Sequence, residues 1–188
     1  MTSLLIASAL CIVLLIPILL RIFVFKKPSH DTDEIDGGVT HYTDTDAPKE
    51  IQSTQIVSFF CEFSATDLSE SSSPIAGRYY TFHAEEDTGS FEARGGGTVF
   101  AERAFVPDKT FFEALQQIVV QHDLAQYNGQ FYTVSGLPPD FGMKLEIRYD
   151  SGEQILCSNN QSCLIPLKAM EELVYLFHPN QFKNQEQE

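Results

Sequence analysis

The sequence has few basic residues. Lys and Arg together number 12 against 26 Asp and Glu, so the 188-residue chain carries a formal net charge of −14. A folded domain with this charge repels nucleic acid phosphates and anionic lipid headgroups. The composition therefore excludes nucleic acid as a partner of the folded part.

Cysteine is also scarce, and the common catalytic motifs are missing. Four cysteines are too few for a disulfide scaffold. No G-x-S-x-G surrounds a serine, and the glycines at 95–97 are not followed directly by a Lys-Ser or Lys-Thr pair, as they would be in a phosphate-binding loop. Structural zinc needs four ligands in close pairs, and Cys157 and Cys163 have no second pair. We expect no metal and no cofactor, and the sequence favours a non-enzymatic protein.

One long apolar segment is present near the N-terminus. Residues 4–25 are apolar apart from the single charge of Arg21. About 20 such residues span the hydrocarbon core of a bilayer. A secretory signal peptide would need basic residues before the run and a small-residue cleavage site after it, and the sequence has neither. We therefore predict a transmembrane anchor over residues 1–27.

The charges that flank this segment indicate its orientation. Arg21, Lys26 and Lys27 lie at its C-terminal end, and no Lys or Arg precedes it. Basic flanks are retained in the cytoplasm. The sequence predicts a single-pass membrane protein whose globular domain lies on the cytoplasmic side.

The rest of the chain divides by composition. Residues 28–50 are acidic and contain few apolar side chains, which predicts a flexible linker because little surface can be buried there. Regular apolar patterns begin at residue 51 and continue to about residue 180. We expect a globular domain over 51–180 and a disordered tail over 181–188.

Alternation of apolar and polar residues predicts the strands of this domain. The expected strands lie at 55–63, 78–86, 90–106 and 129–134, followed by a hairpin over 143–157. Gly95, Gly96 and Gly97 interrupt the third strand. They indicate either a bulge or bend, or a tight turn that divides it in two.

Helical periodicity predicts two helices. Residues 107–124 contain the first, with Thr110 and Glu113 in capping-box spacing, and the second begins at Pro166. Strands joined by short turns are antiparallel. The prediction is an α+β domain in which two helices pack on one face of an antiparallel sheet of about five to six strands.

One part of the domain, residues 127–166, carries a recognisable pattern. Its characteristic residues are Tyr127, Asn128, Gly129, Leu145, Ile147, Tyr149, Gly152, Asn160 and Pro166. The pattern resembles an uncharacterised family of bacterial membrane-anchored domains of unknown function. It departs from that family at Tyr127, where Trp is commoner, and at Ser151, which is inserted between Asp150 and Gly152. The resemblance supports the fold and implies no activity.

Cys157 and Cys163 are six residues apart in a polar stretch. In an oxidising compartment a loop of this size could close as a disulfide, whereas cytosolic glutathione would keep both thiols reduced. The predicted orientation favours reduced thiols.

His83 is the candidate functional residue. It lies in a predicted strand with Glu85 and Glu86 close by, as a general base with an orienting carboxylate would. No nucleophile is fixed near it in the sequence, and an outward-facing strand histidine is the simpler interpretation.

These features predict a membrane-anchored, non-enzymatic binding or adaptor domain with an unknown protein partner. The alternative is an extracytoplasmic domain that binds a ligand or an envelope component and has a Cys157–Cys163 disulfide. A third hypothesis is an enzyme with a dispersed active site centred on His83.

Overall fold

The structure is a computed structural model that describes residues 32–36, 38–68, 72–137 and 141–180. The predicted transmembrane segment 4–25 and the tail 181–188 lie outside these ranges. No helix within the described ranges is both long and apolar enough to span a membrane. The described residues all belong to one compact unit.

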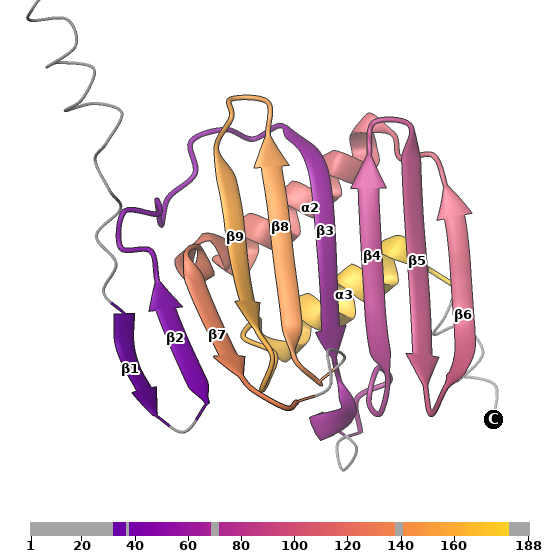
Figure 1. The fold of residues 1–188 in the computed structure, drawn as a ribbon. Helices are drawn as coiled ribbons and strands as arrows, with labels where there is room; N and C mark the ends of the chain where they lie inside the picture. The colour runs from indigo at the N-terminus through magenta and orange to yellow at the C-terminus, as the bar shows by residue number, and fades with distance from the viewer. Residues whose placement is uncertain (1–31, 37, 69–71, 138–140, 181–188) are drawn as a thin grey trace, which may run out of the picture. The chain divides into compact units, whose positions relative to one another are not determined.

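Nine strands form one sheet in the order β1-β2-β7-β9-β8-β3-β4-β5-β6 (Figure 1). The strands are β1 (Thr32–Asp36), β2 (Val39–Thr43), β3 (Ile56–Ser64), β4 (Tyr79–Glu85), β5 (Thr88–Gly95), β6 (Thr98–Phe105), β7 (Gln130–Val134), β8 (Met143–Tyr149) and β9 (Gln154–Asn159). The helices are α2 (Lys109–Gln121) and α3 (Leu167–Phe177), with short 3-10 turns η1 (Thr66–Leu68) and η2 (Leu124–Tyr127).

The predicted α+β class and its two helices are confirmed, but the prediction for the sheet is wrong in two respects. The sheet has nine strands instead of five or six, and it is mixed, because β7 and β9 run parallel. The rule that short turns join antiparallel strands concerns only consecutive strands. It could not foresee that β9 folds back between β7 and β8.

Two of the additional strands, β1 and β2, lie within the segment predicted to be a flexible linker. β2 pairs with β7 along its whole length. Two ring contacts accompany this pairing: Tyr42 stacks on Phe131 at 5.6 Å between ring centroids, and His41 meets Tyr132 edge-on at 4.7 Å. Cross-strand aromatic pairs of this kind stabilise a sheet. The low average apolar content of residues 28–50 does not reveal them. The structured domain therefore begins before the predicted boundary at residue 51.

The glycines in the third predicted strand form a tight turn. Gly96 and Gly97 have φ angles of 56° and 78° and join β5 to β6 as a two-residue hairpin turn. Positive φ at both central residues is typical of the turn whose twist matches antiparallel strands. Of the alternatives left open by the sequence, the division into two strands is correct.

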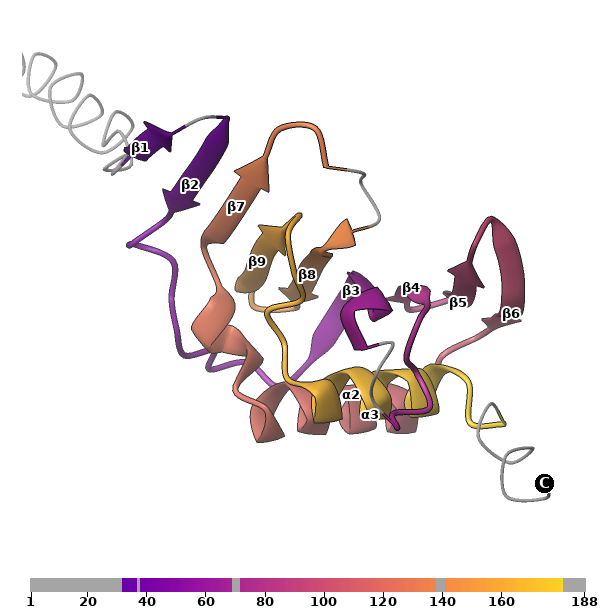
Figure 2. The ribbon, with the colours of Figure 1, turned by 90° about the horizontal axis from the view of Figure 1, so that it is seen from below.

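Both helices pack on the same face of the sheet (Figure 2). Phe177 of α3 lies at the centre of the aromatic contacts, with ring centroids 5.0 to 5.8 Å from those of Phe59, Phe82, Phe105 and Phe111. Because these rings come from β3, β4, β6 and α2, this one residue connects the helix layer to much of the sheet.

The first helix begins with a different cap from the one predicted. The Asp108 carboxylate accepts a hydrogen bond from Phe111 N at 2.8 Å, so Asp108 is the N-cap and the capping box of Thr110 and Glu113 is wrong. Glu113 instead pairs with Lys109 one turn earlier, at 3.4 Å. Asp and Thr are both good caps, and their spacing alone could not decide between them.

Two asparagines flank the parallel pair β7–β9, which has only two residue pairs of its own. At one end, Asn128 Oδ1 accepts from Leu156 N while its amide donates to Pro48 O and Gln154 O, all at 2.8 or 2.9 Å. At the other end, the Asn160 amide exchanges two 2.8 Å hydrogen bonds with the backbone of Val134. Side-chain hydrogen bonds thus extend a short backbone pairing in both directions.

Asn128→Ala should destabilise the domain by roughly 2–4 kcal/mol, because it leaves one buried N–H and two carbonyl groups without partners. Urea unfolding of the full chain, followed by tyrosine fluorescence, measures the change. Asn180→Ala is the control, since Asn180 is exposed and its loss should change the unfolding free energy by less than about 0.5 kcal/mol. Equal effects of the two substitutions would contradict a special role for Asn128.

Candidate functional site

The face of the sheet opposite to α2 and α3 is called the open face here. In β3 the buried residues Phe59, Cys61 and Phe63 point toward the helices, so Phe60 and Glu62 point to the open face. The sheet curves, so that β7 on one side of its centre and β5–β6 on the other rise away from the helices (Figure 2). The open face is therefore concave.

A groove of about 800 Å³ crosses this face over β3, β4, β5 and β6. Its lining includes Phe60, Thr81, Ser90, three glutamates and two arginines, namely Glu62, Glu92, Glu102, Arg94 and Arg103. We call it the acidic groove. It lies where side chains from four strands meet, and no single segment of the sequence contains it.

Strand register aligns the carboxylates of the groove in one row. Glu62 is opposite Thr81, Thr81 is opposite Glu92, and Glu92 is opposite Glu102. The last pair places two like charges directly across a strand pair, which is unfavourable. The Glu92–Glu102 pair is therefore repulsive, and the one neighbouring cation, Arg94, offsets this repulsion only in part.

A β-bulge produces this arrangement. The register between β5 and β6 shifts by one residue after the pair Arg94–Val99, so that Ala93 pairs with Ala101 and Phe100 has no partner in the register. Without the shift, Glu102 would lie opposite the buried Phe91 and point toward the helices, since a one-residue slip moves every side chain to the other face. Because of the bulge, Glu102 faces the groove and Arg103 reaches α3, where its guanidinium donates to Phe177 O at 2.6 Å.

The cations nearest to the row are already engaged. Arg94 lies 3.8 Å from Glu92 and stacks over the Tyr79 ring at 4.7 Å. Lys144 forms a 2.6 Å ion pair with Glu146. Among the described residues, Glu62 and Glu102 have no ion-pair partner. The groove therefore has a net negative charge at its surface.

His83 also points to the open face, next to the groove. Its side chain is 34% exposed, and Nε2 lies 3.6 Å from Glu85 Oε1. Ser90 is opposite His83 in the register, a proximity that local sequence patterns do not predict. No hydrogen bond between Ser90 and His83 occurs in the described structure, so the two do not form the nucleophile–base pair that covalent catalysis requires.

The three described cysteines are free thiols. Cys61 and Cys157 are buried in the core, while Cys163 is partly buried, with Sγ 3.9 Å from Met143 Sδ. Burial raises the pKa of Cys157 from 9.0 to about 12, with a further contribution from Cys163. Burial likewise raises the pKa of Cys163 to about 12. Both groups are therefore neutral and weakly nucleophilic at physiological pH.

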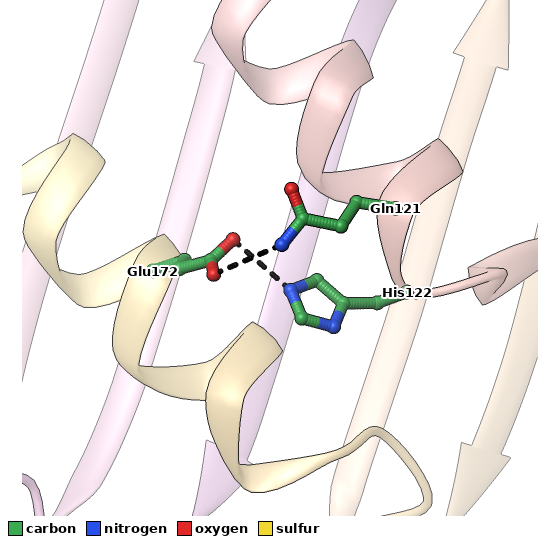
Figure 3. Close-up of polar contacts among 3 residues, drawn as sticks. All are labelled: Gln121, His122 and Glu172. Carbon is green, nitrogen blue, oxygen red and sulfur yellow. Dashed lines mark hydrogen bonds and ion pairs between the residues drawn. The ribbon is translucent and has the colours of Figure 1, made fainter.

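A polar contact between the helices was not foreseen from the sequence. His122 Nε2 lies 3.0 Å from Glu172 Oε2, and the Gln121 amide donates to Glu172 Oε1 at 3.4 Å (Figure 3). The His122 side chain is only 9% exposed. This contact joins the C-terminal end of α2 to α3, so His122 and Glu172 both have a structural role.

Within the described ranges, no group of three or more His, Cys, Asp or Glu side chains could hold a metal ion. Comparison of the chain with protein-family models found no match, and neither did comparisons with curated proteins and with solved structures.

The buried thiols predict a specific pH dependence. In a Cys11→Ser variant in detergent, iodoacetamide should modify the native thiols roughly a thousandfold more slowly at pH 8 than those of the urea-unfolded chain, because only the thiolate reacts. The native rate should keep rising to pH 11, whereas the rate for the unfolded chain should level off above about pH 10, one unit above the ordinary thiol pKa. Quantitative mass spectrometry of the cysteine peptides measures both.

The raised pKa values of the buried thiols also determine how the stability of the fold changes with pH. A thiol whose pKa is raised by folding contributes stability that is complete below its unfolded value of 9.0 and is lost as the pH rises toward about 12. A native modification rate that levels off near pH 9 would contradict this assignment.

Proposed function

We propose that the protein is a membrane-anchored, non-enzymatic binding or adaptor domain that engages its partner through the open face. The observation that carries this proposal is the hollowed, uncovered face of the sheet, with its groove of about 800 Å³. Both helices pack on the opposite side (Figure 2), so the described part of the chain leaves this face available.

An uncovered face alone would be a weak argument, since antiparallel sheets often have one solvated side. The acidic groove differs from an ordinary solvated face in two ways. It is concave, as binding sites usually are. It also aligns Glu92 and Glu102 across a strand pair, an arrangement that costs stability and that a solvated surface has no need to maintain.

The membrane part of the proposal depends on the sequence of residues 4–25 and on the basic residues that follow. Such an anchor would hold the domain near membrane proteins at a high effective concentration, so that even a weak binding face could be occupied. The orientation favoured by Arg21, Lys26 and Lys27 places the domain in the cytoplasm.

Labelling of a Lys168→Cys variant tests the orientation. Lys168 is exposed on α3, whereas the natural thiols in the domain are shielded. A membrane-impermeant maleimide should leave this cysteine unmodified in intact cells and modify it after lysis. The parent chain, treated identically, gives the background. Modification in intact cells would place the domain outside and favour the alternative function with a Cys157–Cys163 disulfide.

Site-specific photo-crosslinking tests the open face. A benzoylphenylalanine at Ser90, which lines the groove, should yield a discrete adduct in cells, identifiable by mass spectrometry. The same group at Gln117, which is exposed on α2, should not yield that adduct. Equal adducts from both positions, or none from Ser90, would contradict the assignment of the open face as the binding surface.

A further inference from the structure

We propose that the occupant of the acidic groove is an extended segment with at least two Lys or Arg side chains, from the cytoplasmic membrane-flanking region of another membrane protein. This inference rests on the proposed function, because it names the class of partner that the open face would take.

The charge of the groove selects a cationic occupant. Glu92 and Glu102 are opposite each other in the register, at which spacing like charges destabilise a strand pair. An ammonium or guanidinium group between them would replace this repulsion with two attractive contacts. Glu62 lies two strands away in the same row, opposite Lys144 in the register. Lys144 is paired with Glu146, so the Glu62 carboxylate can hold a second basic side chain as well.

The width of the groove suits an extended peptide. Four adjacent strands span roughly 14 Å from the first to the last, about the length of four or five extended residues. In such a peptide, alternate side chains point to the same side. Basic residues two positions apart would therefore both face the row of carboxylates.

The apolar part of the lining fits the stems of these side chains. The Phe60 ring lies in the groove, and the Lys144 ammonium already lies 5.4 Å from its centroid, which shows that the ring tolerates a cation beside it. Lys and Arg bury their methylene stems along apolar surfaces while their charged ends remain solvated.

The proposed location of the domain provides such segments. Cytoplasmic loops next to transmembrane helices are rich in Lys and Arg, and an anchor at residues 4–25 would keep the domain close to them. The same carboxylates repel anionic lipid headgroups. The bilayer surface would therefore not compete for the groove.

The test uses the full chain in nanodiscs of phosphatidylcholine and, as the probe, a fluorescein-labelled peptide of alternating Lys and Thr. Fluorescence anisotropy should show saturable binding that weakens with added salt. A peptide of alternating Glu and Thr should not bind.

Two matched triple variants distinguish the contribution of the groove to peptide binding from that of the net charge of the chain. The groove variant carries Glu62→Gln, Glu92→Gln and Glu102→Gln. The control carries Glu50→Gln, Glu86→Gln and Glu113→Gln, which are exposed positions outside the groove with the same change in total charge.

The groove variant should raise the Kd by at least about tenfold, as the loss of three exposed ion pairs implies. The control should change the Kd less than about twofold. The Tm of the groove variant should equal or exceed that of the parent, because the Glu92–Glu102 repulsion is removed, and this excludes unfolding as the cause of weaker binding.

If the two variants weakened peptide binding equally, net charge would account for the binding and the inference would be overturned. An absence of Lys–Thr peptide binding to the parent chain would overturn it too. In that case a Ser90-specific crosslink would still support the open face as the binding surface, whereas loss of that crosslink would contradict the proposed function itself.

Discussion

The continuity of the sheet depends on the short parallel junction between β7 and β9. This junction joins the β1-β2-β7 part to the strands that carry the core and the acidic groove. Two backbone pairs alone would form a weak connection. Asn128 and Asn160 extend it with side-chain hydrogen bonds at both ends. Gly129 adds a steric requirement, since a Cβ there would lie 2.6 Å from Asp44 O. The absence of a side chain at Gly129 thus allows the chain that follows β2, at Asp44, to pass close to the start of β7.

Elements with regular local periodicity were predictable from the sequence. The β8–β9 hairpin, β4 and both helices follow from apolar residues that repeat at strand or helix spacing, because burial of one face determines these elements. Tyr80, Phe82 and Ala84 are buried as their alternation predicts. The strands β1 and β2 were not predictable in this way, since β2 pairs with β7, more than 80 residues away in the chain, and β1 pairs with β2. Long-range pairing leaves little trace in a local pattern.

The candidate site was less predictable than the fold. Alternation correctly placed His83 on the outer face of its strand, but the sequence did not indicate the acidic row. Glu62, Glu92 and Glu102 come together only through the register of four strands. A tight turn at Gly96 and Gly97 would have paired Glu92 with Ala101 by simple symmetry. The bulge at Phe100 changes that partner to Glu102, and no propensity rule indicates the position of a bulge.

The hydrogen bonds around Asn128 have a mechanical consequence. After β2, Asp44 N donates to Gly129 O at 2.8 Å, Lys49 donates to Asn128 O, and the Asn128 amide holds Pro48 O. A load applied from the N-terminal side would first peel β1 and then β2 from the edge of the sheet, and would next meet this set of bonds. At that point the load is shared by several hydrogen bonds at once, whereas the strands separate one residue pair at a time. These hydrogen bonds therefore shield the groove-bearing strands from tension applied at the N-terminal side of the sheet.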